Sequence, residues 1–176
     1  SLGLEGSAIL ASDRREKLSA VLTREELAEA ACYLSYLSVL KEGRLGARLG
    51  VQYMHDITEG GLLGAVYETA QAIGQGIRVE EHRLPVTQTT RKIADAFSID
   101  PLRLISSGSM LRVIPEEKEK EAERLFFEAD IPLTIIGTVT EKDVVMATES
   151  GLRPIPAPEK DELYTALKHT EKERLI

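Results

Sequence analysis

The chain has 176 residues, 43% of them hydrophobic and 29% charged, which is enough for one globular domain with a proper core. A formal net charge of −7, scattered basic residues and the lack of Trp argue against a nucleic-acid surface or an anionic-membrane surface. The single cysteine, Cys32, excludes an internal disulfide framework and a cysteine-based zinc cluster, and the apolar helical stretch around it predicts a buried, inert side chain.

The histidines do not indicate a metal site in this chain. His55, His82 and His169 are far apart in sequence and show no metal-ligand spacing. There is no signal peptide, and no apolar run is long enough to span a bilayer. The cytoplasm is therefore the expected location.

The first half of the chain alternates between predicted strands and helices. The opening residues begin without a cap or an initiator Met, which suggests a piece of a longer protein. In chain order we expect a strand at Ala8–Ala11, a long helix opened by the Thr23–Glu26 capping box and running to Leu40, a loop from Gly43 to Gly50, a strand from Leu49 into His55, and a helix from about Glu59 to Ile73 that Gly74 ends.

The second half continues this alternation. We expect a strand at Ile77–Glu80, a helix opened by Pro85 and Thr87 with Ile93, Ala94 and Phe97 on one face, a strand at Met110–Ile114, a helix at Glu116–Glu128, strands at Pro132–Val139 and Val144–Ala147, and a polar helix at Glu159–Leu167 before a charged end. The elements predict an α+β fold, an α/β sandwich in which a mixed sheet is covered by helices.

The most informative segment runs from His55 to Gly61, between a predicted strand and a predicted helix. Backbone N–H groups and the positive end of the helix dipole meet at such a turn, where an anion such as phosphate can dock. Thr58 is placed to cap the helix, and Gly60 and Gly61 let a ligand approach the backbone. The alternative is an ordinary capped turn whose glycines merely fit. Asp56 could coordinate magnesium or orient a substrate, and His55 could act as an acid or base, although both are weak catalytic candidates.

A second turn, Ser106–Ser109, follows another apolar segment. Its hydroxyl groups and the backbone around Gly108 suit phosphate or ribose oxygens, while the alternative is an ordinary Ser-Gly turn. Residue chemistry alone thus leads to an α/β domain with one good anion-binding turn.

Residues His55–Gly64 resemble the HDxTxGGL signature in the C-terminal domain of the aminoimidazole ribonucleotide (AIR) synthetase superfamily. The opening Gly3–Ala11 and the block Asp100–Ser109 are similar to further blocks of the hydrogenase-maturation branch, and Ile136–Val139 is similar to a strand near the domain's end. The resemblance spans about Gly3 to Pro156, and it implies the fold of that C-terminal domain over residues 1–156, followed by a helix and charged tail over 157–176.

This resemblance implies a two-domain, ATP-dependent enzyme of which only the second domain is present. The full-length protein would use ATP and Mg²⁺, and the absent N-terminal domain would supply the metal ligands, so that no metal is expected in this chain. That domain would be this chain's partner and would form a homodimer, with no nucleic-acid or membrane partner. By position, the residues expected to bind a small phosphorylated ligand are Asp56, Thr58, Gly60, Gly61, Ser107 and Gly108. The alternative is a stand-alone, non-catalytic module that binds a nucleotide, a phosphorylated metabolite or a partner protein.

Two departures from the family pattern affect the expected chemistry. Selenophosphate synthetases carry Gly-Phe-Gly where this chain has Glu59-Gly60-Gly61. The hydrogenase-maturation dehydratase ends in Pro-Arg-Ile-Cys with a cysteine that accepts the carbamoyl group, whereas this chain ends Glu173-Arg174-Leu175-Ile176. The charged end reads as a natural one, so the expectation is a relative that does not perform that chemistry.

The resemblance also makes a geometric prediction. Gly60 and Gly61 should open a helix whose N-terminus lies beside the Ser106–Ser109 turn, about 45 residues away in sequence. A bulky residue at Gly61 should then weaken ligand binding while costing little in folding.

Overall fold

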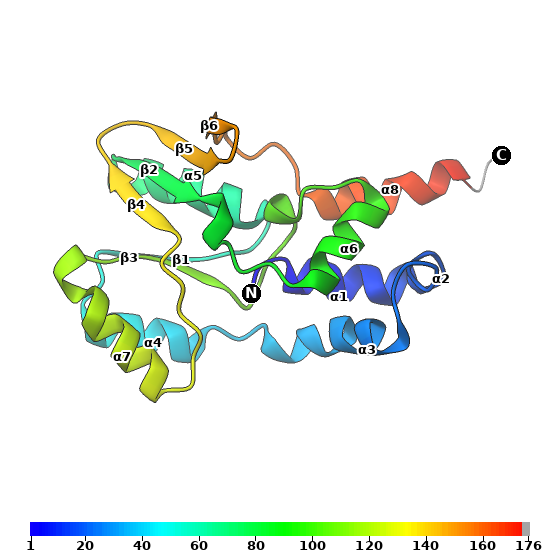
Figure 1. Cartoon of the computed structure of the whole chain (residues 1–176), viewed down its shortest axis with the longest axis horizontal. Coiled ribbons are helices and arrows are strands. Elements are labelled where there is room, and N and C mark those ends of the chain that lie inside the picture. The colour runs from blue at the N-terminus through cyan, green and yellow to red at the C-terminus, as the bar shows by residue number, and fades with distance from the viewer. Residues whose placement is uncertain (174–176) are drawn as a thin grey trace.

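The structure, a computed structural model, describes residues 1–173. Figure 1 shows the strands on the left together with α4, α5 and α7, and the helices α1, α2, α3, α6 and α8 on the right. The α-helices are α1 (Leu4–Asp13), α2 (Arg15–Leu18), α3 (Arg24–Cys32), α4 (Leu40–Leu49), α5 (Gly61–Ile73), α6 (Gln88–Phe97), α7 (Glu119–Glu128) and α8 (Glu162–Glu173). The strands are β1 (Tyr53–Asp56), β2 (Gly76–Glu80), β3 (Met110–Val113), β4 (Gly137–Thr140), β5 (Val144–Thr148) and β6 (Gly151–Pro154). Short 3-10 turns are η1 (Tyr33–Tyr36), η2 (Glu81–Arg83), η3 (Pro101–Arg103) and η4 (Glu116–Lys118).

The strands form two sheets, and the predicted α+β class with a mixed sheet and helices is confirmed. β1 pairs antiparallel with β3, which sets Asp56 opposite Met110. The larger sheet has the order β4-β2-β5-β6, with β2 antiparallel to β4 and parallel to β5. The expectation of one sheet is corrected to two, because residues 132–136, predicted as part of a strand, lie outside the ladder that begins at Gly137.

Two apolar cores hold these layers together. The first joins helices: Leu10 of α1, Ala30 of α3 and Ile93 of α6 are buried there, and so is Ala166 of α8. In the second core, Leu62 and Val66 of α5 pack beside Val79 of β2 and Met146 of β5. Helix α5 thereby connects the larger sheet to the turn that precedes it.

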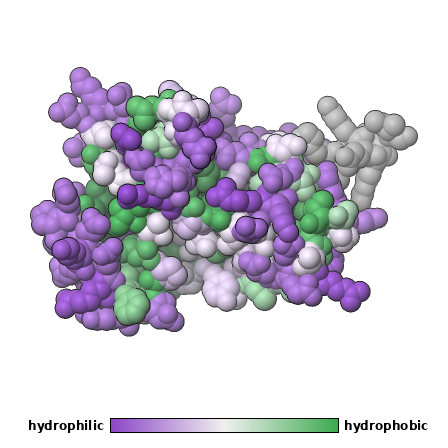
Figure 2. Space-filling model, in the orientation of Figure 1, coloured by the Kyte–Doolittle hydropathy of each residue, from purple (hydrophilic) through white to green (hydrophobic). Residues whose placement is uncertain are grey.

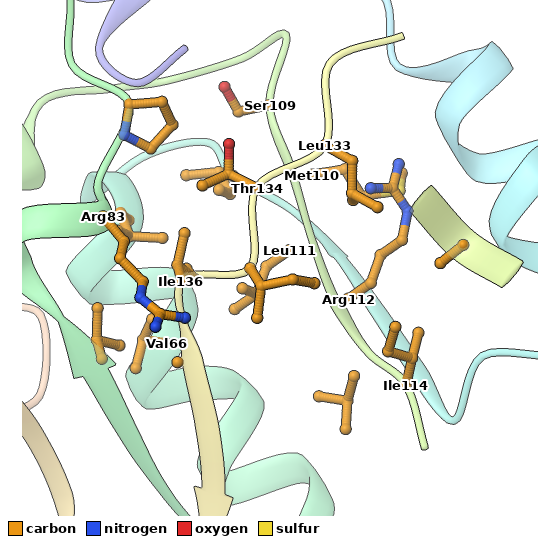
Figure 3. Close-up of a pocket in the computed structure, with 18 of the residues that line it drawn as sticks. Val66, Arg83, Ser109, Met110, Leu111, Arg112, Ile114, Leu133, Thr134 and Ile136 are labelled. Atoms are coloured by element: carbon orange, nitrogen blue, oxygen red, sulfur yellow. The ribbon is translucent and has the colours of Figure 1, made fainter. Parts of the chain in front are cut away.

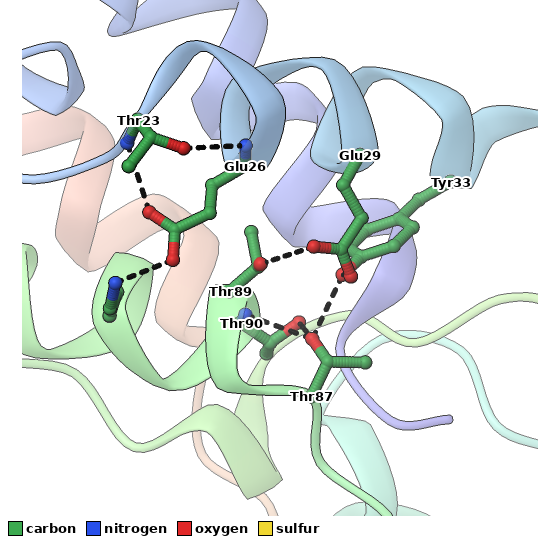
Figure 4. Close-up of polar contacts among 8 residues, drawn as sticks. Thr23, Glu26, Glu29, Tyr33, Thr87, Thr89 and Thr90 are labelled. Atoms are coloured by element: carbon green, nitrogen blue, oxygen red, sulfur yellow. Dashed lines mark hydrogen bonds and ion pairs between the residues drawn. The ribbon is translucent and has the colours of Figure 1, made fainter.

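Hydrogen bonds between side chains join α3 to α6 (Figure 4). The predicted capping box is present, since the backbone N–H of Glu26 donates to the Thr23 hydroxyl and the Glu26 carboxylate accepts from the Thr23 N–H. One turn later the Glu29 carboxylate accepts from the hydroxyls of Tyr33 and Thr89, both at 2.6 Å. Burial, and then the adjacent Glu29, raise the pKa of the Tyr33 hydroxyl.

Several predicted elements in the first 50 residues were wrong. Ala8–Ala11 belongs to helix α1 and not to a strand, because a short apolar run fits either structure and here α3, α6 and α8 surround it. The helix predicted to run to Leu40 ends at Cys32. The Cys32 side chain, predicted to be buried, is exposed. The expected loop from Gly43 is helix α4, whose Gly46 lets Met54 and Arg112 approach the backbone.

The later elements follow the expected order, with small shifts at their ends. Helix α6 begins after Thr87, whose hydroxyl accepts from the Thr90 N–H at 3.0 Å. The edge strand β6 was not predicted, and the C-terminal helix begins at Glu162 rather than Glu159. Of the charged end, residues 174–176 lie outside the described residues.

Candidate functional site

The turn between β1 and α5 has the predicted strand-turn-helix form, with a different cap. The N-cap of α5 is Gly60, which has a positive φ of 83° and offers no side chain to cap the helix. The expectation that the Thr58 side chain caps α5 is wrong because the helix begins at Gly61, which places Thr58 two residues before the cap. The Thr58 carbonyl instead accepts from the backbone N–H of Gly61 at 3.1 Å and of Ser106 at 3.3 Å.

The N-terminus of α5 already faces a carboxylate of this chain. The Gly60 N–H donates to Asp161 Oδ2 at 2.7 Å, and the Leu163 N–H donates to Asp161 Oδ1 at 2.8 Å. Asp161 is buried, with 2% of its surface exposed, and burial raises the pKa of its carboxyl against the lowering effect of these N–H donors. One carboxylate thus ties the start of α5 to the start of α8.

Asp161 was not among the residues predicted from the sequence. The signal that could have identified it is local, since an Asp directly before a helical run is a preferred N-cap. Its second contact, to Gly60, joins residues 101 positions apart and left no local pattern. Pro158 also lies close to Gly60 and Gly64, so the segment before α8 covers this end of α5.

The two predicted turns meet, as expected. The Ile57 N–H donates to the Ser109 carbonyl at 2.9 Å, and the Ser106 N–H donates to the Thr58 carbonyl. Gly61 lies against the chain just before the second turn: a Cβ there would be 2.6 Å from the Leu102 carbonyl oxygen. The expectation that a bulky residue at Gly61 costs little in folding is therefore wrong, because it would collide with backbone.

Within the second turn, only some side chains are available to a ligand. The Ser106 hydroxyl is buried and accepts from the Gly3 N–H at 2.8 Å, so its role is structural. Ser107 and Gly108 are partly exposed. Gly108 has a φ of 95° and lies against the backbone of Tyr36, which leaves no room for a side chain.

His55 and Asp56 differ in what they contact. The His55 ring lies 2.7 Å from Glu68 Oε2 through Nε2 and 2.6 Å from the Asp56 carbonyl through Nδ1. Both partners are acceptors, so each ring nitrogen faces an oxygen atom of this chain. The Asp56 side chain is exposed, and partial burial raises the pKa of its carboxyl, opposed by His55 and reinforced by Glu5.

Asp56, Thr58 and Ser107 therefore offer one carboxylate and two hydroxyls beside a glycine turn. Within residues 1–173, no group of three or more His, Cys, Asp or Glu side chains is arranged to hold a metal ion. No helix in the same part of the chain is long and apolar enough to cross a membrane.

Comparison with known proteins connects this arrangement to a family. The family described as "AIR synthase related protein, C-terminal domain" matches residues 1–148. A putative hydrogenase expression/formation protein of Methanocaldococcus jannaschii is 32% identical over 127 residues, covering 68% of this chain and 36% of the relative. Carbamoyl dehydratase HypE of Escherichia coli is 30% identical over 146 residues, covering 81% of this chain and 40% of the relative.

Solved structures agree with the sequence relatives. The crystal structure of E. coli HypE superposes with a TM-score of 0.72 at 25% identity, covering 94% of this chain and 50% of that one. A structure of the hydrogenase maturation protein HypE in complex with ATP superposes with a TM-score of 0.60 at 25% identity, covering 68% of this chain and 41% of that one. The chain spans about half or less of the length of the proteins it matches.

Proposed function

The chain belongs to the AIR synthase related family, as its C-terminal domain, and we propose that it is the second half of an ATP-dependent enzyme of the hydrogenase-maturation type. In this proposal, residues 1–156 form the domain that closes over the phosphate and substrate cleft, and residues 157–176 add a helix and charged tail. The observation that carries the proposal is the family match over residues 1–148. The relatives in hydrogenase maturation are more than twice as long as the segments that match this chain.

In this proposal, the N-terminal half of the parent protein binds the nucleotide and the metal ion. We place the nucleotide site, the magnesium ligands and a homodimer contact of a cytoplasmic parent protein in that half. Mg²⁺ binds through several oxygen ligands, and the α5 turn offers the one exposed carboxylate of Asp56, so further ligands would have to come from the other half. ATP, when bound by the parent, would supply the phosphoryl group.

The contribution of this chain would be positioning and charge. Asp56 and Thr58 are exposed in the α5 turn, and Ser107 is partly exposed on the adjoining turn. Gly61 lets the α5 turn lie directly against residues 102–104, just before the second turn, so that these side chains can contact a phosphorylated ligand held by the other half. Because Asp161 occupies the Gly60 N–H, we assign the contacts to side chains rather than to the helix end.

The test compares this chain with the parent protein that carries the preceding half. We expect the parent to hydrolyse or transfer phosphate from ATP and the 176-residue chain to be inactive. In the parent, Asp56→Asn should lower kcat at least about tenfold, the size expected from one charged hydrogen bond at about 1.5–3 kcal/mol. Asp13→Asn, an exposed change on α1, serves as the control.

Two results would contradict the proposal. ATP turnover by the isolated chain would show that the nucleotide site does not need the other half. A start codon directly before Ser1, together with binding of a nucleotide or phosphorylated metabolite by the chain alone, would instead favour a stand-alone binding module.

A further inference from the structure

A cavity of about 1110 Å³ lies between the two sheets, next to the α5 turn. Residues 131–136 run beside β3 there, and side chains from both segments enter the space (Figure 3). The cavity reaches Gly108 and Ser109 at one end, but Asp56, Thr58, Gly60 and Gly61 do not line it. Ile57 and Leu62, on either side of that turn, do line it, so the cavity adjoins the site proposed above but presents a different set of side chains.

One part of the cavity wall is apolar, and polar side chains form the rest. Val66 of α5 and Val79 of β2 are fully buried members of the second core and form one side of it. Leu111 and Ile136 project into its middle (Figure 3). On the molecular surface, hydrophobic residues gather between β4 and α7, in a rim of hydrophilic ones (Figure 2).

The buried guanidinium group of Arg112 lies at one end of the cavity. The Arg112 guanidinium carbon lies 4.5 Å from the centre of the Phe126 ring, and its Nε and Nη2 atoms are buried without a hydrogen-bond partner. Burial lowers the pKa of this guanidinium, and the nearby Glu42 only partly opposes the shift. Buried N–H donors of this kind are normally satisfied, so Arg112 has the capacity to bind an acceptor.

A second positively charged side chain, that of Arg83, lines the cavity on the side away from Arg112 (Figure 3). Arg83, on η2, directs its guanidinium toward Ile136 (Figure 3). Glu42 also lines the cavity, and its Oε2 is buried without a hydrogen-bond partner. This carboxylate disfavours a doubly charged phosphate near Arg112 and leaves a singly charged head as the better match. A carboxylate has the planar shape that a guanidinium binds through two parallel hydrogen bonds.

We propose that this cavity binds a small amphiphilic carboxylate, with the head on Arg112 and the apolar body against Leu111 and Ile136. The segment 131–136 forms part of the cavity wall. It is held at its ends, where the Ile131 N–H donates to the Phe126 carbonyl at 2.9 Å and the Ile136 carbonyl accepts from the Glu80 N–H at 2.8 Å.

The experiment titrates the 176-residue chain with octanoate, and with octanamide as the uncharged match, by isothermal calorimetry. We expect octanoate to bind with a dissociation constant of about 1 mM or lower, and octanamide at least about tenfold more weakly. Arg112→Met retains an apolar stem and removes the charge, so it should weaken octanoate binding at least about tenfold and leave octanamide unchanged. Arg91→Met, an exposed change on α6, is the matched control.

A steric variant keeps the test decisive if Arg112→Met does not fold. Leu111→Trp fills the middle of the cavity and should abolish binding of both probes, while circular dichroism reports whether each variant is folded. The proposal is overturned if octanoate fails to bind up to 10 mM (roughly tenfold above the expected constant), if octanoate and octanamide bind equally, or if Arg112→Met and Arg91→Met bind octanoate alike. Loss of octanoate binding in the parent protein would also overturn it, because the cavity would then be a docking surface for the other half.

Discussion

At the residue scale, glycines set the geometry of the α5 turn for two separate reasons. Gly60, Gly61 and Gly74 all adopt positive φ values, which residues with a Cβ rarely adopt. Gly61 has a second constraint that Gly74 does not share. A Cβ at Gly61 would lie 2.6 Å from the Leu102 oxygen and 2.8 Å from the Leu104 oxygen, whereas nothing lies within 4 Å of a Cβ at Gly74. A side chain at Gly74 would therefore meet only backbone strain, whereas a side chain at Gly61 would meet both backbone strain and a collision.

This difference predicts the result of two alanine substitutions. Gly74→Ala should lower the free energy of unfolding by about 1–2 kcal/mol, the cost of a left-handed conformation. Gly61→Ala should lower it by more than about 3 kcal/mol, because the backbone of residues 102–104 must also move. Urea denaturation of both variants measures this, and equal losses would show that the α5 turn relaxes without cost.

At the element scale, one acceptor on α3 serves both the turn that follows α3 and helix α6. The Glu29 carboxylate receives hydroxyl hydrogens from Tyr33, on η1 just after α3, and from Thr89 of α6. Tyr33 also contacts the Thr87 hydroxyl at 2.9 Å. Since both donors share Glu29, their contributions to stability should not be independent.

A double-mutant cycle tests this coupling. Tyr33→Phe and Thr89→Val should each cost about 1–2 kcal/mol of unfolding free energy. The double variant should cost at least about 0.5 kcal/mol less than their sum, because Glu29 is exposed and turns to water once either donor is lost. Thr148→Val, on β5, supplies the distant control and should be additive with Tyr33→Phe. Full additivity of Tyr33→Phe with Thr89→Val would mean that the two hydroxyls act separately.

Local signals explain which elements the sequence predicted. Helix α6 was predicted because Thr87 caps it and its apolar positions repeat with the helical period, and both are properties of neighbouring residues. Helix α4 was not predicted, because Gly43 and Gly46 read as a loop. In the fold, Gly46 is small so that Met54 can pack against it, and that packing comes from another element. The edge strand β6 is exposed along its length and contains a Pro, so it has no apolar alternation to detect.

The candidate site was predictable to a similar degree. The turn, its glycines and its meeting with Ser106–Ser109 followed from motifs, whereas the occupation of the Gly60 N–H by Asp161 depends on packing across the molecule. Whether Asp56, Thr58 and Ser107 bind a phosphorylated ligand stays a prediction.

At the scale of the whole molecule, Asp161 makes stability depend on pH. Burial raises the pKa of its carboxyl in the folded chain, so the folded state holds this proton more tightly than the unfolded state does. Its contribution to stability is therefore full below the unfolded pKa, near 4, and is lost as the pH rises through the folded pKa.

The change Asp161→Asn should remove this dependence while keeping one acceptor oxygen for a backbone N–H. The stability of the original chain relative to the variant should be larger at about pH 4 than at about pH 7. Urea denaturation at the two pH values measures the difference, with Asp13→Asn as an exposed control. A relative stability that instead grows toward pH 7 would mean that the N–H donors outweigh burial.

The contacts of α1 and α8 have a consequence for how the chain folds during synthesis. Gly3 is bonded to Ser106, Gly60 to Asp161, and Arg14 to the carbonyl of Leu167, over separations of 103, 101 and 153 residues. Until α8 has left the ribosome, the first helical core lacks Leu163 and Ala166, and the start of α5 has no carboxylate partner. The domain should thus complete its folding only after translation reaches α8, and the many distant contacts should make that step slow. Its nascent chain would meanwhile expose apolar surface that chaperones recognise.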